Sequence, residues 1–133
     1  MAAVVVDTHA IVWYLMKDSR LSVKARTALN SATASGEAIH VPSVCLVELT
    51  YLVEKGRVPQ LARDRLIQVI DDDSTALRLA ALDRSVADAL ELVSRREVPD
   101  FPDRIISATA VALRIPLVSR DGKIRSSAVE TIW

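Results

Sequence analysis

Four carboxylates occupy positions where the neighbouring residues are apolar or form a sharp turn. Asp7 stands between residues 2–6, AAVVV, and an apolar stretch that resumes at Ala10. Glu48 is the sole charged side chain between residues 41 and 53, VPSVCLVELTYLV, and a helix that apolar is expected to be buried almost all round. Burial of an unpaired carboxylate is costly or raises its pKa. A cation that meets these acids would explain why the chain keeps them.

Two further acids follow breaks in the chain. Asp103 lies in PDFPDRIISATAVAL, three residues after Asp100, and Asp121 lies in LVSRDGKI. The residue before a proline is biased away from helix, so Pro102 is predicted at the first helical position. Asp103 then falls in the first turn of that helix.

Each acid by itself also has a structural interpretation. Asp7 suits the cap of the helix that follows it, Asp103 suits the positive end of a helix dipole, and Asp121 suits a turn. An arginine partner would account for Glu48. Taken together the four favour a shared site, because an α/β arrangement can bring all of them to one rim of a sheet.

The chemistry of such a site follows from charge. Carboxylates a few ångströms apart repel by about 4 kcal/mol per pair at an effective dielectric constant of about 20. Mg²⁺ removes this penalty, since it binds oxygen ligands and completes its shell with water and substrate phosphates. One or two such ions activate water for phosphodiester cleavage. Zinc is disfavoured, because the single cysteine, Cys45, and the two histidines show no ligand pairing.

Short β-branched runs alternate with stretches of helical periodicity. Strands are predicted at residues 3–6, 38–41, 76–80, 116–119 and 129–132. Helices are predicted at residues 11–16, 21–34, 43–55, 61–70, 84–94 and 103–114, with a turn at 120–123. Ser22 is the expected cap of the second helix and Gly36 its expected stop. This alternation predicts an α/β domain with a mostly parallel sheet, whose ligands bind beyond the carboxyl ends of the strands.

Composition narrows the class of protein. The 133 residues suit one domain, and 17 basic against 17 acidic residues give no net charge that would by itself indicate nucleic acid. A lone cysteine excludes an internal disulfide and fits a reducing cytoplasm. The apolar start lacks the basic region and cleavage pattern of a signal peptide, and no apolar run reaches the ~20 residues of a membrane span. We therefore expect a cytoplasmic protein with no membrane partner.

The segments VVVDTHAIVWYL, PDFPDRIISATA and LVSRDGKI, with the Glu48 helix between the first two, resemble the PIN-domain ribonucleases. The likeness is closest to the VapC-type toxins of type II toxin–antitoxin pairs. It implies one PIN domain over residues 1–133, with a parallel sheet of order 3-2-1-4-5 and helices on both faces. It also implies endonucleolytic cleavage of RNA that depends on Mg²⁺ or Mn²⁺. A small antitoxin partner and a homodimer are further implications.

Site residues carry over from the family pattern position by position. The metal-binding and catalytic acids correspond to Asp7, Glu48, Asp103 and Asp121. Supporting positions correspond to Thr8, Ser119 and Arg104. The proline is displaced by one residue in Asp-Phe-Pro-Asp-Arg, which leaves open whether Asp100 reaches the metal or only caps the helix. Cys45 stands where relatives commonly have serine, and neither departure removes a ligand.

Several residues beside the motifs have two interpretations. His9 is a candidate base but is favoured as packing or surface, and Trp13 and Tyr14 are favoured as core over base stacking. Arg104, Arg120 and Lys123 adjoin the acids and are the better candidates for phosphate contact.

Two alternative functions are also consistent with the sequence. A PIN nuclease of RNA maturation without an antitoxin is one alternative, and a non-catalytic PIN-like binding scaffold is another. A P-loop or dinucleotide domain is excluded, because the only glycines are Gly36, Gly56 and Gly122.

Overall fold

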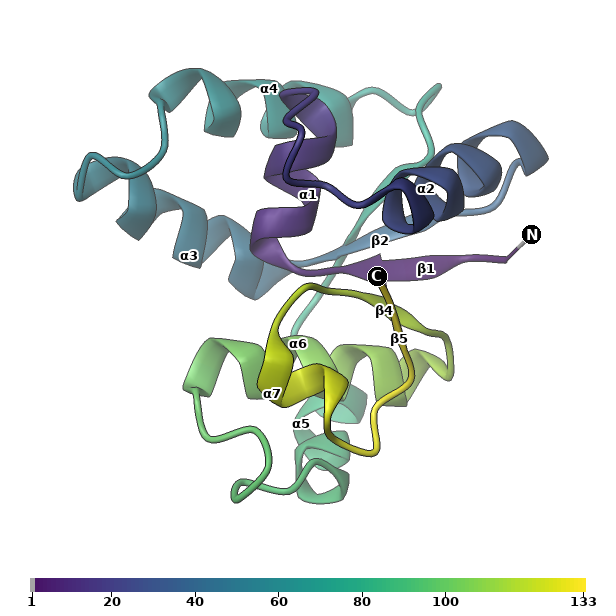
Figure 1. Cartoon of the computed structure of the whole chain (residues 1–133), viewed down its shortest axis with the longest axis vertical. Helices are drawn as coiled ribbons and strands as arrows, with labels where there is room; N and C mark the ends of the chain where they lie inside the picture. Colours follow the sequence, from purple (N-terminus) through teal and green to yellow (C-terminus); the bar gives the residue numbers. More distant parts are fainter. Residues whose placement is uncertain (1) are drawn as a thin grey trace.

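The computed structural model describes residues 2–133, and a five-stranded sheet lies at its centre (Figure 1). Its order is β3-β2-β1-β4-β5, and every neighbouring pair is parallel. The strands are β1 (Val4–Val6), β2 (Ile39–Pro42), β3 (Leu77–Ala80), β4 (Leu117–Val118) and β5 (Thr131–Ile132). The predicted α/β class, the parallel sheet and the order 3-2-1-4-5 are confirmed.

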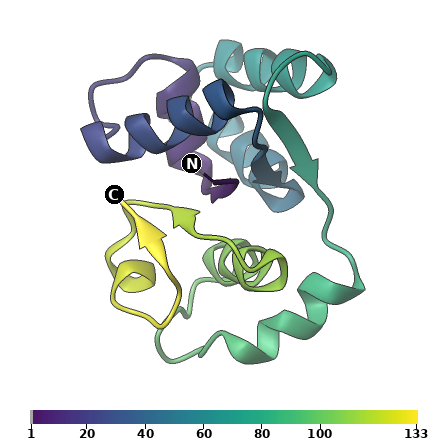
Figure 2. The same cartoon turned by 90° about the vertical axis from the view of Figure 1, so that its right-hand side faces the viewer.

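Helices cover both faces of this sheet. One side carries α1 (Thr8–Leu15), α2 (Val23–Ser35) and α4 (Gln60–Asp71). The other side carries α5 (Arg84–Ala89), the 3-10 helix η1 (Leu90–Leu92), α6 (Phe101–Leu113) and the single-turn α7 (Gly122–Arg125). Figure 2 shows the two layers edge-on, with the termini between them. Helix α3 (Ser43–Glu54) follows β2 and contacts α1, α4 and α6, so it joins the two layers.

The core is built around β1 and α6. All three residues of β1 are buried, as expected for a central parallel strand covered on both faces. Helix α6 packs on β1 and buries six consecutive residues, 105–110, because α3 and α5 cover its remaining sides. The first residues of α6 are thereby held at a defined place beside the sheet.

Local signals explain where the second helix begins and ends. The Ser22 hydroxyl accepts a hydrogen bond from the Ala25 N–H at 3.0 Å, and Gly36 ends the helix with φ 75°. Both predicted roles are confirmed. Among residues 2–133, no helix is long and apolar enough to cross a membrane.

Three predicted elements differ from the structure. The helix predicted at 84–94 divides into α5 and η1, and residues 122–125 form a helical turn where a turn was expected. Helix α6 begins at Phe101, so Pro102 takes the second helical position instead of the first. The start of α6 differs only at an element end, whereas the division of 84–94 and the helical turn at 122–125 change the type of local structure.

The expectation that the Glu48 helix is buried almost all round is wrong. Only Cys45 and Leu49 of α3 are buried, whereas Val47 and Tyr51 are 55% and 59% exposed. Helix α3 packs at the edge of the layers, so one face meets the core and the opposite face meets solvent. Apolar content alone does not show which face is covered.

We predict that Ile106→Ala lowers the free energy of unfolding by about 2–5 kcal/mol, because it leaves a cavity where α6 meets β1. Ile106 is fully buried. Leu113→Ala, at a 41% exposed position of the same helix, is the control and should cost less than about 1 kcal/mol. Urea titration of both variants measures the difference, and equal losses would contradict the central role of α6 in the core.

Candidate active site

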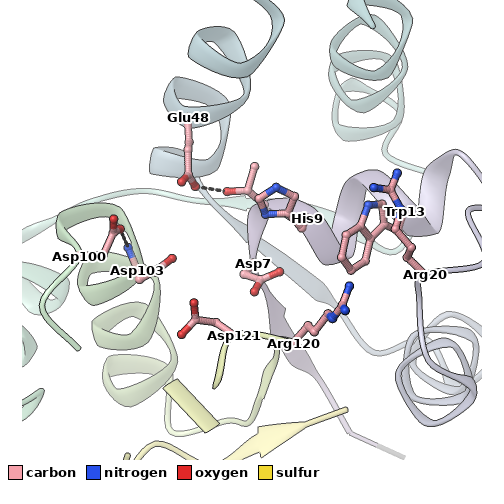
Figure 3. A pocket seen from close by; sticks show the side chains of 10 residues that line it. Asp7, His9, Trp13, Arg20, Glu48, Asp100, Asp103, Arg120 and Asp121 are labelled. Carbon is pink, nitrogen blue, oxygen red and sulfur yellow. Dashed lines mark hydrogen bonds between the residues drawn. The ribbon is translucent and has the colours of Figure 1, made fainter. Parts of the chain in front are cut away.

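A cavity of about 460 Å³ opens where β1 and β4 end and where α1, α3, α6 and α7 approach one another (Figure 3). Acidic, basic and aromatic side chains from distant parts of the sequence meet in it. Its lining residues are Asp7, Thr8, His9, Trp13, Arg20, Glu48, Asp100, Asp103, Arg120 and Asp121. All four acids predicted to share a rim therefore lie in one cavity, at the carboxyl ends of the strands.

Asp7 is positioned by the end of β1 and the start of α1. Its N–H donates to the Val118 carbonyl of the neighbouring strand at 3.2 Å, and its carboxylate accepts the Ala10 N–H at 2.9 Å as the cap of α1. Burial raises the pKa of this carboxyl, and hydrogen bonds from Ser119 and the Ala10 N–H counteract part of that rise. The cap and cavity roles suggested by the sequence thus coexist in one side chain.

Glu48 is connected to α1 through Thr8, the residue that follows Asp7. The Thr8 hydroxyl, which is buried, donates to a carboxylate oxygen of Glu48 at 2.5 Å. Within residues 2–133, Glu48 forms no ion pair. The arginine partner considered for Glu48 is therefore absent from the described chain, and a hydroxyl orients the carboxylate instead.

The first turn of α6 contributes two acids. Asp100 caps the helix, since its carboxylate accepts the Asp103 N–H at 3.1 Å. The pKa of the Asp103 carboxyl is raised to about 7, first by partial burial and then by the negative charges of Asp100, Asp121, Glu48 and Asp7. Burial is the larger cause of this rise, and the neighbouring carboxylates add to it.

Ser119 connects the acids of β1 and β4. Its hydroxyl accepts the Asp121 N–H at 3.1 Å and hydrogen-bonds to the Asp7 carboxylate, and the side chain is completely buried. Asp121 in turn caps α7 by accepting the Ile124 N–H at 2.9 Å. Ser119 therefore contacts two cavity acids, and its orienting role stays a prediction of the family resemblance.

Arg104 does not line the cavity. Its guanidinium donates to the backbone carbonyls of Val93 at 3.0 Å and Leu90 at 2.9 Å, which ties α6 to η1. Two of its five N–H donors therefore brace the helix against η1, and the structure places Arg104 outside the cavity where a phosphate contact was expected. Lys123 lines an adjoining groove that shares Asp100, Asp103 and Asp121 with the cavity. Of the three cations named from the sequence, Arg120 lines the acidic cavity itself.

The aromatic residues follow the favoured interpretations. Trp13 is 7% exposed, with its ring edge at the cavity, and the Tyr14 hydroxyl donates to Asn30 at 2.8 Å away from it. His9 is exposed at the rim, with its ring 5.6 Å from that of Trp13. Sequence reasoning did not find Arg20, although the spacing Asp18-Ser-Arg20 was a local signal for the ion pair that now positions it.

The model of the PIN domain family matches residues 4–129. The chain belongs to the PIN domain family. Ribonuclease VapC22 of Mycobacterium tuberculosis is 29% identical over 126 residues, which span 95% of this chain and 92% of that protein.

Solved structures share the fold at lower identity. The structure of VapBC2 from Rickettsia felis bound to a DNA fragment from its promoter contains a chain with TM-score 0.70 and 17% identity, covering 97% of this chain and 96% of that one. A chain of FitAcB from Neisseria gonorrhoeae has TM-score 0.62 and 16% identity, covering 96% of this chain and 95% of that one. Both likenesses extend over the whole PIN domain.

The donor set of this PIN domain fits a hard cation. The cavity offers carboxylate and hydroxyl oxygens, and its single histidine, His9, is at the rim, so Mg²⁺ or Mn²⁺ suits it better than zinc. No three His, Cys, Asp or Glu side chains within residues 2–133 are grouped closely enough to form a finished metal site. A bound cation would offset the repulsion among these carboxylates, which adds to the effect of burial on the pKa of Asp103.

We predict that the stability gained by Asp103→Asn depends on pH. The folded pKa of about 7 exceeds the ordinary value of 3.8, so the wild-type protein loses stability as pH rises from about 4 to about 7. Solvent screening of this partly exposed group reduces the loss to about 1–2 kcal/mol. Without metal, Asp103→Asn should match the wild type near pH 4 and exceed its stability by that amount at pH 8.

Thermal or urea unfolding in a chelator at both pH values measures this effect. Asp73→Asn removes a charge from an exposed turn outside the cavity and serves as the control. An Asp103→Asn protein less stable than the wild type at pH 8 would show that Asp103 is a structural partner instead of a member of a repelling cluster.

Proposed function

We propose that this chain, as one PIN domain over residues 1–133, is a metal-dependent endoribonuclease and the toxin of a toxin–antitoxin pair. The observation that carries the proposal is the meeting of Asp7, Glu48, Asp103 and Asp121 in one cavity of a PIN domain. These acids come from four separate segments, and nothing in the packing of the core requires them to meet. The name of the similar Mycobacterium protein, a ribonuclease, supports RNA as the substrate.

In this proposal the acids hold Mg²⁺ or Mn²⁺ and the neighbouring residues orient them. Thr8 directs Glu48 through its hydroxyl, and Ser119 holds the Asp7 carboxylate in place. Asp100 acts through the start of α6, where its cap fixes the turn that carries Asp103. A bound divalent cation would supply activation of water and neutralisation of phosphate charge.

Asp103 links ion binding to the loss of a proton. The carboxyl pKa of Asp103 is raised to about 7, so at neutral pH this group is protonated in part of the molecules, and that proton must leave before the carboxylate binds an ion. Ion binding should therefore release a proton and become tighter as pH rises. Binding of a cation would in turn offset the repulsion among the carboxylates of the cavity.

A small antitoxin is the proposed protein partner. The Rickettsia and Neisseria structures named above are of VapBC2 and FitAcB, which supports a partner for this chain by analogy of fold. We also propose a homodimer and a cytoplasmic location, on the family resemblance and the lone buried cysteine. A small reading frame directly upstream, whose product relieves growth arrest on co-expression, would separate the toxin from a nuclease of RNA maturation.

We predict that the purified protein cleaves RNA only with added Mg²⁺ or Mn²⁺, and that Asp7→Asn reduces the rate by more than about 100-fold. Loss of an outer partner of a metal site costs 10–100-fold, so loss of a ligand should cost more. Total bacterial RNA is the substrate, with sequencing of the new ends, so that structured targets are included. Asp73→Asn, prepared in the same way, is the control for the charge change.

Equal cleavage by the wild type and Asp7→Asn would contradict this site and indicate a contaminating nuclease. If neither protein cuts, Mg²⁺-dependent stabilisation decides what remains. A wild-type melting temperature that does not rise with Mg²⁺ would favour the non-catalytic binding scaffold, since a ligand that binds the folded state must stabilise it.

A further inference from the structure

Two guanidinium groups meet over one indole ring in the wall of the acidic cavity. The Cζ atom of Arg20 is 5.1 Å from the centroid of the Trp13 ring, and that of Arg120 is 5.7 Å from it. Both distances lie within the range of cation–π attraction. Among residues 2–133, these are the only Lys or Arg side chains that line this cavity.

Trp13 gives the pair a fixed support. The indole is almost fully buried in α1 and packs against Trp133, with ring centroids 5.9 Å apart. A buried ring has little rotameric freedom, because neighbouring atoms occupy the alternative positions. The two guanidinium groups are therefore held at the cavity by a platform that belongs to the core.

The two arginines differ in how many donors remain free. Arg20 gives its Nε–H and one terminal N–H to the Asp18 carboxylate at 3.0 and 2.7 Å, which orients the guanidinium and lowers the pKa of Asp18 to about 2. Five N–H donors are present on each guanidinium, so three remain on Arg20. The Arg120 side chain makes no hydrogen bond or ion pair within residues 2–133, and it is exposed.

Charge is distributed unevenly across the cavity. Figure 3 shows Asp100 and Asp103 on one side and Trp13 with Arg20 on the other, and Arg120 lies near Trp13. The acidic side repels a polyanion unless a cation covers it, whereas the arginine side attracts one. A nucleic acid strand whose scissile phosphate meets the acids finds Arg20 and Arg120 in the wall of the same cavity, whereas Lys123 lines the adjoining groove beside Asp103 and Asp121.

We propose that Arg120, assisted by the Asp18-oriented Arg20, binds a phosphodiester group of the RNA strand next to the scissile one. The inference rests on the proposed nuclease function and specifies how that site holds its substrate. A guanidinium suits this task, because its fork of donors matches two phosphate oxygens. Trp13 acts by positioning the cations and not by stacking on a base, since its ring is almost fully buried.

The test measures binding separately from cleavage. A fluorescein-labelled single-stranded RNA is titrated with wild type, Arg120→Gln and Arg96→Gln in EDTA, between about 50 and 200 mM salt. Arg96 is exposed, carries the same charge and lies outside the cavity, so it is the matched control. Arg120 is also exposed, and its replacement should leave the fold intact.

We expect Arg120→Gln to weaken RNA binding about tenfold at the lower salt concentration. The slope of log K against log salt should fall by about 0.7, the value for one phosphate contact of a single strand. Arg96→Gln should match the wild type. Arg120→Lys should recover the salt slope and only part of the affinity, because it keeps the charge without the fork.

Equal affinity and slope for Arg120→Gln and Arg96→Gln would overturn the inference. Displacement of the RNA by poly-L-glutamate as effectively as by unlabelled RNA would also overturn it, in favour of an acidic protein segment as the ligand. Absence of metal-dependent cleavage by the wild type is a different result. It contradicts the nuclease proposal, whereas the dependence of RNA binding on Arg120 is measured in EDTA without any cleavage.

Discussion

The acids of the cavity repel one another, and the packing of the surrounding elements has to hold them close despite that repulsion. Burial, and after it the charges of the neighbouring acids, raise the pKa of the Asp103 carboxyl, so the folded chain holds this group where its ionised form is disfavoured. Nothing in the core needs them there. The buried β1 strand and the buried face of α6 supply the packing that holds the acids close, and burial of apolar surface offsets what the charges cost.

Backbone N–H groups donate hydrogen bonds to three of the cavity's carboxylates. Asp7, Asp100 and Asp121 each cap a helix, and each accepts a backbone N–H at about 3 Å. The positive ends of α1, α6 and α7 therefore all face the cavity, and the helix dipoles favour negative charge there. All three side chains start helices, and two of them, Asp7 and Asp121, are also proposed metal ligands. Substituting any of them should affect local structure as well as activity.

Much of the fold was predictable because its signals are local. The β-branched run before Asp7 and the Ser22 cap each depend on neighbouring residues, and the structure has both. Cavity residues from four segments were predictable because each acid stood in an apolar or turn-forming context. The exposed face of α3 was not, since Val47 and Tyr51 look like core residues until the partners of the helix are known. The position of Arg104 outside the cavity was not predictable for the same reason, because its backbone partners at Leu90 and Val93 are distant in sequence.

The sequence by itself determined the alternation of strands and helices, the acids that follow them and the family to which the chain belongs. These properties depend on residue type and spacing along the chain. Only the tertiary structure decided that Thr8 meets Glu48, that Ser119 joins Asp7 to Asp121, and that Trp13 carries two arginines. The contacts of Thr8 with Glu48, Ser119 with Asp7 and Arg120 with Trp13 join residues far apart in sequence, and their geometry depends on how the layers pack on the sheet.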